Sequence, residues 1–151
     1  MKASVCPLAR SLDLVGDRWS LLIVGEALRG SRRFSEFERR LGLAKNILAE
    51  RLRRLVAEGV MEAAPSSTGS SHRIYNLSEK GEALYLTLAA LWQWSEAYCF
   101  SPDERSFTLV DRVDQDRLMP LKLVTTEGRV MGPYDCIGQM MPTHPRPDTN
   151  T

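Results

Sequence analysis

The feature that most constrains the fold of this chain is a pair of short helical patterns, separated by one glycine and followed by two strand patterns. Residues 36–41 are typical of a brief helix, which Gly42 ends, and residues 44–58 carry leucines at helical spacing. Residues 60–64 and 73–77 are typical of strands, and residues 65–71 are all Pro, Ser, Thr or Gly. This order predicts a winged helix-turn-helix with a flexible wing tip.

Capping patterns indicate where the helices start. Asp17 can cap a helix that carries apolar residues at three- and four-residue spacing, and residues 7–15 predict a shorter helix before it. Ser35 and Glu38 have the spacing of a capping box for helix 36–41. In helix 44–58 the opposite face is expected to be exposed, because the leucines predict one buried stripe. That stripe consists of Leu48, Leu52 and Leu55.

A long helix is expected after the hairpin. Ser78 can cap a helix that reaches Tyr98 and has two apolar stripes. Because a helix that is apolar on two sides needs two partners, one partner in a chain this small is expected to be the same helix of a second subunit. The sequence therefore predicts a homodimer. One stripe consists of Leu84, Leu88 and Leu91, and the other of Ala83, Leu86, Ala90, Trp94 and Ala97.

The composition changes after Ser101. Phe107, Leu109, Leu121 and Leu123 alternate with polar neighbours, which predicts a small β extension over residues 101–138. The tail over residues 139–151 is rich in proline and is expected to be mobile. The predicted fold is therefore mostly α, with a β-hairpin wing and a long C-terminal dimerisation helix in residues 1–100, followed by the short β extension.

Composition and residue counts exclude several classes of protein. The longest uncharged apolar stretch, residues 83–95, is too short to span a membrane, and no leader pattern opens the sequence, so we expect a cytoplasmic protein. Three scattered cysteines and only two histidines, His72 and His144, give neither zinc-ligand spacing nor a catalytic Ser/His/Asp set. We therefore expect no metal, no cofactor and no enzymatic activity.

Basic residues are concentrated in the two central helices. The net charge of the chain is +1, but residues 29–54 hold nine Lys or Arg against three Glu, a local charge of +6. A solvated pair of helix faces is the alternative explanation for such a cluster. Its position on a helix-turn-helix pattern favours duplex DNA as the partner, and a protein-interaction module that binds no specific DNA is the competing hypothesis.

The second of these helices is expected to read DNA. Lys45 and Asn46 stand at its start, where side chains reach base edges in the major groove, and Arg53 shares their face. The alternative for Asn46 is a role in helix capping, and for Arg53 and Arg54 a salt bridge with Glu50. The predicted set also includes residues that suit phosphate or minor-groove contacts. It consists of Arg32, Arg33, Lys45, Asn46, Ala49, Glu50, Arg53, Arg54 and Arg73.

Six short motifs, in collinear order over about residues 5–100, resemble the HxlR family of bacterial transcription regulators, in the MarR-like superfamily. The resemblance implies a dimeric winged-helix regulator, such as a repressor, that binds an operator near the genes it controls. The predicted homodimer implies that this operator is near-palindromic. Dimer contacts would come from the first helix and the long last helix. The start of the reading helix at Leu43 and Ala44 lacks the Ser or Thr usual in the family. The motifs are residues 6–10, 16–23, 33–37, 48–52, 58–60 and 75–81.

Cys6 is the candidate for redox sensing. Pro7 suits the first position of a helix, which places Cys6 at the N-terminus, where unpaired amides and the helix dipole favour a thiolate. Some HxlR-family members sense oxidants or electrophiles through a cysteine at the matching position, so the resemblance implies an electrophile or another small molecule as the effector. The alternative is that Cys6 packs as a small apolar residue in the dimer interface.

Overall fold

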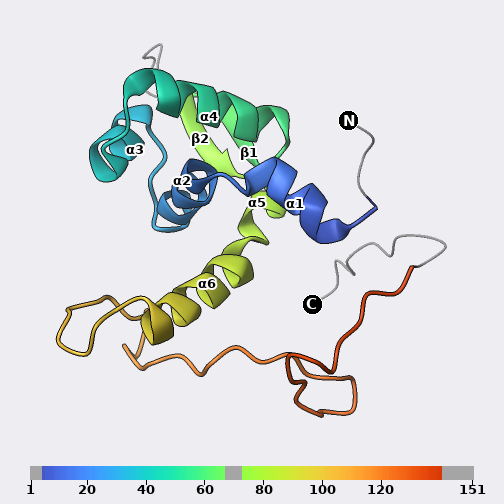
Figure 1. The fold of residues 1–151 in the computed structure, drawn as a ribbon. Coiled ribbons are helices and arrows are strands. Elements are labelled where there is room, and N and C mark those ends of the chain that lie inside the picture. Colours follow the sequence, from blue (N-terminus) through green and yellow to red (C-terminus); the bar gives the residue numbers. More distant parts are fainter. Residues whose placement is uncertain (1–4, 67–72, 141–151) are drawn as a thin grey trace. The chain divides into compact units, whose positions relative to one another are not determined.

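The computed structural model describes residues 5–66 and 73–140 of the chain. Figure 1 shows helices followed by a β-hairpin and then by further helices. The chain divides into two compact units, Met1–Arg117 and Leu118–Thr151, and every labelled element lies in the first. The elements are α1 (Pro7–Val15), α2 (Arg18–Leu28), α3 (Phe34–Leu41), α4 (Lys45–Ala57), β1 (Met61–Pro65), β2 (Arg73–Leu77), α5 (Glu79–Glu82) and α6 (Tyr85–Tyr98).

Asp17 caps α2, as its sequence predicts. Its Oδ1 accepts hydrogen bonds from the backbone N–H groups of Trp19 and Ser20, both at 3.0 Å, and its Oδ2 accepts one from Ser20 Oγ. Partial burial raises the pKa of the Asp17 carboxyl, but the hydrogen bonds from Ser20 and Trp19 and the charge of Arg51 outweigh burial. The pKa of Asp17 therefore lies below its ordinary value of 3.8.

We expect Asp17→Ala to lower the free energy of unfolding by about 1 kcal/mol at neutral pH, because it removes the helix cap. A depressed carboxyl pKa stabilises the fold above the unfolded-state value, and this contribution is lost as pH falls through the folded-state pKa. The difference between wild type and variant should therefore shrink below pH 3.8. Urea unfolding at several pH values measures it, with Asp17→Asn as a control that keeps a neutral cap. An unchanged difference at acidic pH would mean that the carboxylate charge contributes nothing.

The start of α3 differs from the prediction. The helix begins at Phe34, two residues before the expected start, and Ser35 and Glu38 do not form its capping box. Instead, Glu36 Oε2 accepts the backbone N–H groups of Arg32 at 2.7 Å and Arg33 at 2.9 Å. These hydrogen bonds hold the pKa of Glu36 below its ordinary value, with the bond from Arg32 as the largest cause. The capping carboxylate therefore lies one turn inside the helix and fixes the loop before it.

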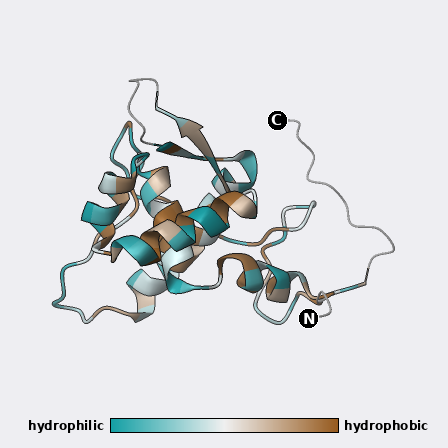
Figure 2. Cartoon of the chain, turned by 90° about the horizontal axis from the view of Figure 1, so that it is seen from above, coloured by the Kyte–Doolittle hydropathy of each residue, from teal (hydrophilic) through white to brown (hydrophobic). Residues whose placement is uncertain are grey.

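The predicted buried stripe of α4 is confirmed. Leu48, Leu52 and Leu55 are fully buried and pack with apolar residues of α2, α3 and the first strand. In Figure 2, hydrophobic and hydrophilic stretches alternate along the helices, as expected for elements with one buried side. The face of α4 opposite these leucines is therefore held toward solvent. The other buried core residues are Val15, Ile23, Val24, Ala27, Phe37, Leu43, Val60 and Met61.

The hairpin pairs β1 with β2 in antiparallel register, from Met61 opposite Leu77 to Pro65 opposite Arg73. The second strand has its predicted bounds, and the first is shifted by one residue. The predicted flexible tip falls largely on residues 67–72, which lie outside the described residues. Arg33 forms an isolated antiparallel bridge with Ile74, so the loop before α3 adds a short third edge to the hairpin. This pairing ties the start of α3 to the second strand of the hairpin.

The long helix predicted after Ser78 is interrupted by a turn at Ala83 and Leu84, between α5 and α6. Ser78 Oγ caps α5 as predicted, since it accepts the Gly81 N–H at 3.1 Å. Gly81 is buried against the hairpin, and a Cβ there would lie 2.1 Å from the Val60 carbonyl oxygen. Close packing thus holds α5, and the Leu84 N–H then bonds to the Gly81 carbonyl, three residues back.

The two apolar stripes of α6 have different surroundings. Leu84 and Leu88 pack against the core of their own chain. Within the described residues, α6 contains no buried residue, and Leu86, Leu91 and Trp94 are about half exposed. The first stripe is therefore divided, because Leu84 and Leu88 pack inside the chain whereas Leu91 is exposed, and Leu86 and Trp94 of the second stripe face solvent in a single copy.

The β structure predicted after residue 100 is limited to two isolated antiparallel bridges, Val110 with Arg117 and Val124 with Val130. Of the predicted mobile tail, residues 141–151 lie outside the described residues. Trp92 Nε1 donates to the Phe107 carbonyl at 3.0 Å, which ties the beginning of this segment to α6. In the described ranges, no helix has both the length and the apolar character that crossing a bilayer requires.

Candidate nucleic-acid interface

One face of α4 is exposed along its whole length. Lys45, Ala49 and Arg53 follow one another at four-residue spacing, and Asn46 and Glu50 lie beside them. All five side chains are exposed, and the opposite side of the helix is buried in the core. The structure therefore brings these five predicted residues together on one surface, which we call the reading face.

Several arginines of the basic cluster form ion pairs with acidic residues of the same chain. Glu26 is buried at the C-terminal end of α2, where its carboxylate pairs with Arg29 at 2.9 Å and Arg40 at 3.4 Å. Arg51 lies 3.6 Å from Asp17 Oδ1, on the side of α4 that faces α2. These three arginines contribute to the local charge of +6, but Arg40 and Arg51 link α3 and α4 to α2, and Arg29 pairs within the last turn of α2.

Two residues of the predicted DNA-binding set also bind backbone carbonyls of their own chain. Arg32 Nη1 donates to the carbonyls of Ala27 at 2.5 Å and Ser31 at 2.9 Å. Arg54 Nη2 donates to the Asp13 carbonyl at the end of α1, which links α4 to that helix. These hydrogen bonds favour a structural role for Arg32 and Arg54.

Fewer basic residues remain without such internal contacts, and they lie on or beside α3, α4 and β2. Within the described residues, Arg33, Arg39, Arg53 and Arg73 are exposed and form neither an ion pair nor a side-chain hydrogen bond. Lys45 is also exposed and lies 3.9 Å from Glu38 Oε1, a weak surface pair. Arg39 is not among the residues predicted from the sequence to bind DNA. Its signal was an exposed cation in the first helix of the motif, a helix that crosses the DNA backbone in helix-turn-helix proteins.

Arg73 is the basic residue in the described part of the hairpin, and it lies at the end of the strand pairing that adjoins the tip. Arg73 pairs with Pro65 at the last described position of the hairpin, and Arg33 bridges the neighbouring Ile74. The backbones of Arg33 and Arg73 are therefore adjacent, although the two residues are far apart in sequence. His72, which precedes Arg73, lies outside the described residues.

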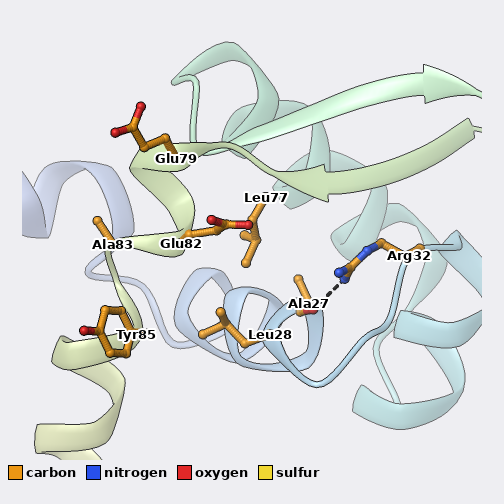
Figure 3. A pocket seen from close by; sticks show the side chains of 8 residues that line it. All are labelled: Ala27, Leu28, Arg32, Leu77, Glu79, Glu82, Ala83 and Tyr85. Carbon is orange, nitrogen blue, oxygen red and sulfur yellow. Dashed lines mark hydrogen bonds between the residues drawn. The ribbon is translucent and has the colours of Figure 1, made fainter. Parts of the chain in front are cut away.

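A cavity of about 590 Å³ lies between the end of α2, the end of β2, and α5. Figure 3 shows the Arg32 guanidinium directed toward Ala27 and the Glu82 carboxylate directed toward Leu77. Within the described residues, Glu79 and Glu82 form no ion pair, so the cavity carries two carboxylates beside one guanidinium. Its lining therefore combines charged groups with apolar side chains. The lining residues are Ala27, Leu28, Arg32, Leu77, Glu79, Glu82, Ala83 and Tyr85.

The cysteines are accessible and do not form a metal cluster. Cys6 stands immediately before Pro7, at the N-terminal cap of α1, as predicted, and Cys6, Cys99 and Cys136 are all exposed. In the described part of the chain, no group of three His, Cys, Asp or Glu side chains could hold a metal ion.

The helix-turn-helix formed by α3 and α4, the hairpin that follows it and the exposed reading face define a winged-helix protein. The chain belongs to the HxlR-like helix-turn-helix family, which matches residues 14–103. Membership agrees with the resemblance noted in the sequence, and the matched range includes both helices of the motif, the wing and α6.

Two regulators from other bacteria are similar in sequence to this chain. Rv3095 of Mycobacterium tuberculosis, an uncharacterized HTH-type transcriptional regulator, is 40% identical over 96 residues, or 64% of this chain and 61% of Rv3095. The match therefore spans less than two thirds of that relative. YodB of Bacillus subtilis, an HTH-type transcriptional regulator, is 31% identical over 101 residues, or 66% of this chain and 90% of YodB.

Solved structures share the fold. PA1607, a candidate transcription factor, superposes with a TM-score of 0.87 at 46% identity and covers 91% of this chain and 96% of its own. The reduced form of YodB superposes with a TM-score of 0.56 at 29% identity, covering 67% of this chain and all of YodB. YodB has also been solved after diamide treatment. The match to PA1607 extends past residue 103, where the family match ends.

Proposed function

We propose that this protein is an HxlR-type transcriptional regulator that binds a near-palindromic operator in duplex DNA as a homodimer. The observation that carries the proposal is the reading face of α4, which is exposed along its length and backed by three buried leucines. A rigid helix of this kind fits the major groove, which is wide enough to admit an α-helix. The family and its relatives support this assignment.

Each residue of the interface has a role that its chemistry suits. Asn46 can pair with adenine and Arg53 with guanine or a phosphate, while Lys45 suits a phosphate at the start of the helix. Ala49 leaves space for a thymine methyl group, and Glu50 can accept from cytosine. Arg33, Arg39 and Arg73 are proposed to hold the DNA backbone on both sides of the reading face, with Arg73 also suited to the minor groove. Arg32 and Arg54 support the surface from within.

The exposed apolar residues of α1 and α6 support the homodimer. Leu8 and Leu12 of α1 are exposed, as are Leu91 and Trp94 of α6. Apolar helix faces of this extent are buried in stable proteins, and two copies of one face can bury each other about a two-fold axis. Such a dimer would present its reading helices about 34 Å apart, one turn of DNA.

Fluorescence anisotropy with labelled duplexes tests the proposal. A duplex from upstream of the gene that encodes this chain should bind more tightly than a random duplex of equal length. The affinity should fall steeply as the salt concentration rises, because binding releases counterions from the phosphates. Equal affinity for both duplexes would leave only nonspecific DNA binding. Binding to neither would favour the competing hypothesis of a protein-interaction module. A regulator of this kind is expected to work in the cytoplasm, where its DNA lies.

We further propose that modification of Cys6 controls DNA binding. The thiol is exposed, and it precedes the first turn of α1, a helix that the proposed dimer uses. Modification there would alter the packing of α1 against a second subunit and hence the spacing of the reading helices. YodB, whose structure is known in a reduced and in a diamide-treated form, supports examining this thiol first.

Diamide is expected to weaken operator binding of the wild type by tenfold or more, and to leave Cys6→Ser unaffected. Operator affinity measured before and after treatment tests this. Because Cys99 and Cys136 are exposed as well, Cys99→Ser and Cys136→Ser serve as matched controls and should keep the response. An unchanged wild-type affinity would exclude thiol control and direct attention to a small effector in the cavity beside Glu82.

A further inference from the structure

Glu26 is a buried acid in the last turn of α2, among apolar neighbours. It is 8% exposed, and Ile23, Val24 and Ala27 of the same helix are fully buried. A carboxylate loses its hydration on burial, so it persists in such a place only with charged hydrogen-bond partners. An apolar side chain would serve packing alone, so the ion pairs of Glu26 call for a separate explanation.

Arg29 extends the contacts of Glu26 to α6. Its Nη1 lies 2.9 Å from Glu26 Oε1, and its Cζ lies 5.3 Å from the centre of the Trp92 ring. The second distance is within the range of a cation–π interaction. One guanidinium group therefore contacts both the buried carboxylate of α2 and an aromatic side chain of α6, the helix to which the proposed dimer interface is assigned.

Arg40 extends the contacts of Glu26 to α3. Its Nη1 lies 3.4 Å from Glu26 Oε2, and it belongs to the last turn of α3, directly after Arg39. Arg39 is exposed and is proposed to hold the DNA backbone. Gly42 then ends α3 in the left-handed conformation, with a φ of 63°, and the reading helix α4 begins at Lys45. The ion pair therefore holds the part of the helix-turn-helix that leads into α4.

We propose that Glu26 is a positioning residue for operator binding. Its two carboxylate oxygens join Arg29 beside α6 to Arg40 of α3, so one buried group fixes the orientation of the DNA-binding helices relative to the dimerisation helix. All three helices belong to the first compact unit, Met1–Arg117. The inference rests on the proposed operator-binding homodimer and extends it, because the spacing of the two reading helices depends on this orientation in each subunit.

A positioning role predicts a loss of affinity that depends on the DNA sequence. An operator with two half-sites needs both reading helices in the correct grooves at once, whereas random DNA is bound through its phosphates in any register. Loss of the Glu26 charge also releases Arg29 and Arg40, which favours contacts with phosphates. The affinity for the operator should therefore fall, and the affinity for random DNA should not.

Glu26→Gln tests this in the full-length dimer, because glutamine keeps the size of the side chain and removes its charge. The ratio of operator affinity to random-duplex affinity, measured by fluorescence anisotropy, should fall at least about tenfold, and light scattering should still give a dimer. An unchanged ratio overturns the proposal. So does an equal loss on both duplexes, which a smaller folded fraction alone would cause. A monomeric variant also overturns it, because Glu26 would then maintain the dimer rather than orient the DNA-binding helices.

Arg40 and Arg39 give a matched pair of variants in one turn of α3, with the same change of charge. Both side chains reach the surface, so this pair decides the question even if Glu26→Gln does not fold. Arg40→Gln should lower the affinity ratio, because it breaks the ion pair with Glu26 from its exposed end. Arg39→Gln should weaken both duplexes alike, as expected for a phosphate contact. If Arg40→Gln behaves like Arg39→Gln, Arg40 contacts phosphate and the proposal is wrong.

Trp92→Leu tests the connection to α6, because it removes the aromatic ring beside Arg29 and keeps an apolar side chain. It should also lower the affinity ratio. The double variant Glu26→Gln/Trp92→Leu should lose no more than the larger of the two single losses, since both changes break one chain of contacts. Losses that multiply would show that Trp92 acts independently and would overturn the link from α6 to α3. A wild type that binds the operator no better than random DNA would instead refute the proposed function itself, and this inference with it.

Discussion

Replacing Trp94 with glutamate is expected to raise the dissociation constant of the dimer by at least about a hundredfold and to abolish tight operator binding. Trp94 is 57% exposed in the single chain and lies 6.0 Å, between ring centroids, from Tyr98, so the two rings form a continuous apolar surface on α6. Aromatic residues at the centre of an interface contribute most of its energy, and an unpaired carboxylate in that place costs several kcal/mol.

The fold of the monomer should survive this change, because Trp94 does not belong to the residues packed on the core. Circular dichroism checks this, and sedimentation equilibrium measures the dissociation constant. Trp94→Leu is the matched control, since it keeps an apolar side chain and should remain dimeric. If Trp94→Glu sediments as the wild-type dimer, the exposed stripe of α6 does not form the interface. Leu88→Glu would be a poorer test, because Leu88 packs on the core of its own chain.

Features with a local cause could be predicted from the sequence. The buried stripe of α4 follows from helical periodicity alone, and the Asp17 cap lies within three residues of the groups it binds. Neither feature depends on where the rest of the chain folds. The two stripes of the long helix were predictable for the same reason, but their division between the chain's own core and solvent depends on tertiary packing.

Features that depend on distant contacts could not be predicted. The start of α3 is set by the loop that bridges Ile74 of the hairpin, about forty residues later, and this loop lets Glu36 cap the helix. The turn between α5 and α6 follows the close approach of Gly81 to Val60. Arg54 looked available because its partner, the Asp13 carbonyl, is a backbone atom of another helix. A carbonyl partner leaves no sign in a count of charges.

Because several of the basic residues are bound within the chain, fewer of them are available to recognise DNA. The local charge of +6 suggested a broad basic surface, yet the structure leaves a smaller set of available arginines around one helix. Arg53 is the member of that set on the reading face itself. A surface with few available cations leaves more of the affinity to base contacts, which makes the effect of one arginine larger and easier to assign.

Arg53→Ala is therefore expected to weaken binding to the specific operator by about 1 to 3 kcal/mol, which is roughly 5- to 150-fold, and to weaken random DNA much less. Arg33→Ala should weaken both duplexes alike and lower the slope of log affinity against log salt by about one per subunit, as expected for a phosphate contact. Anisotropy titrations at several salt concentrations measure both quantities. Arg105→Ala, which removes an exposed arginine outside the helix-turn-helix, is the control for net charge. Equal losses on specific and random DNA for Arg53→Ala, with a reduced salt slope, would assign Arg53 to a phosphate and leave base reading to Asn46 and its neighbours.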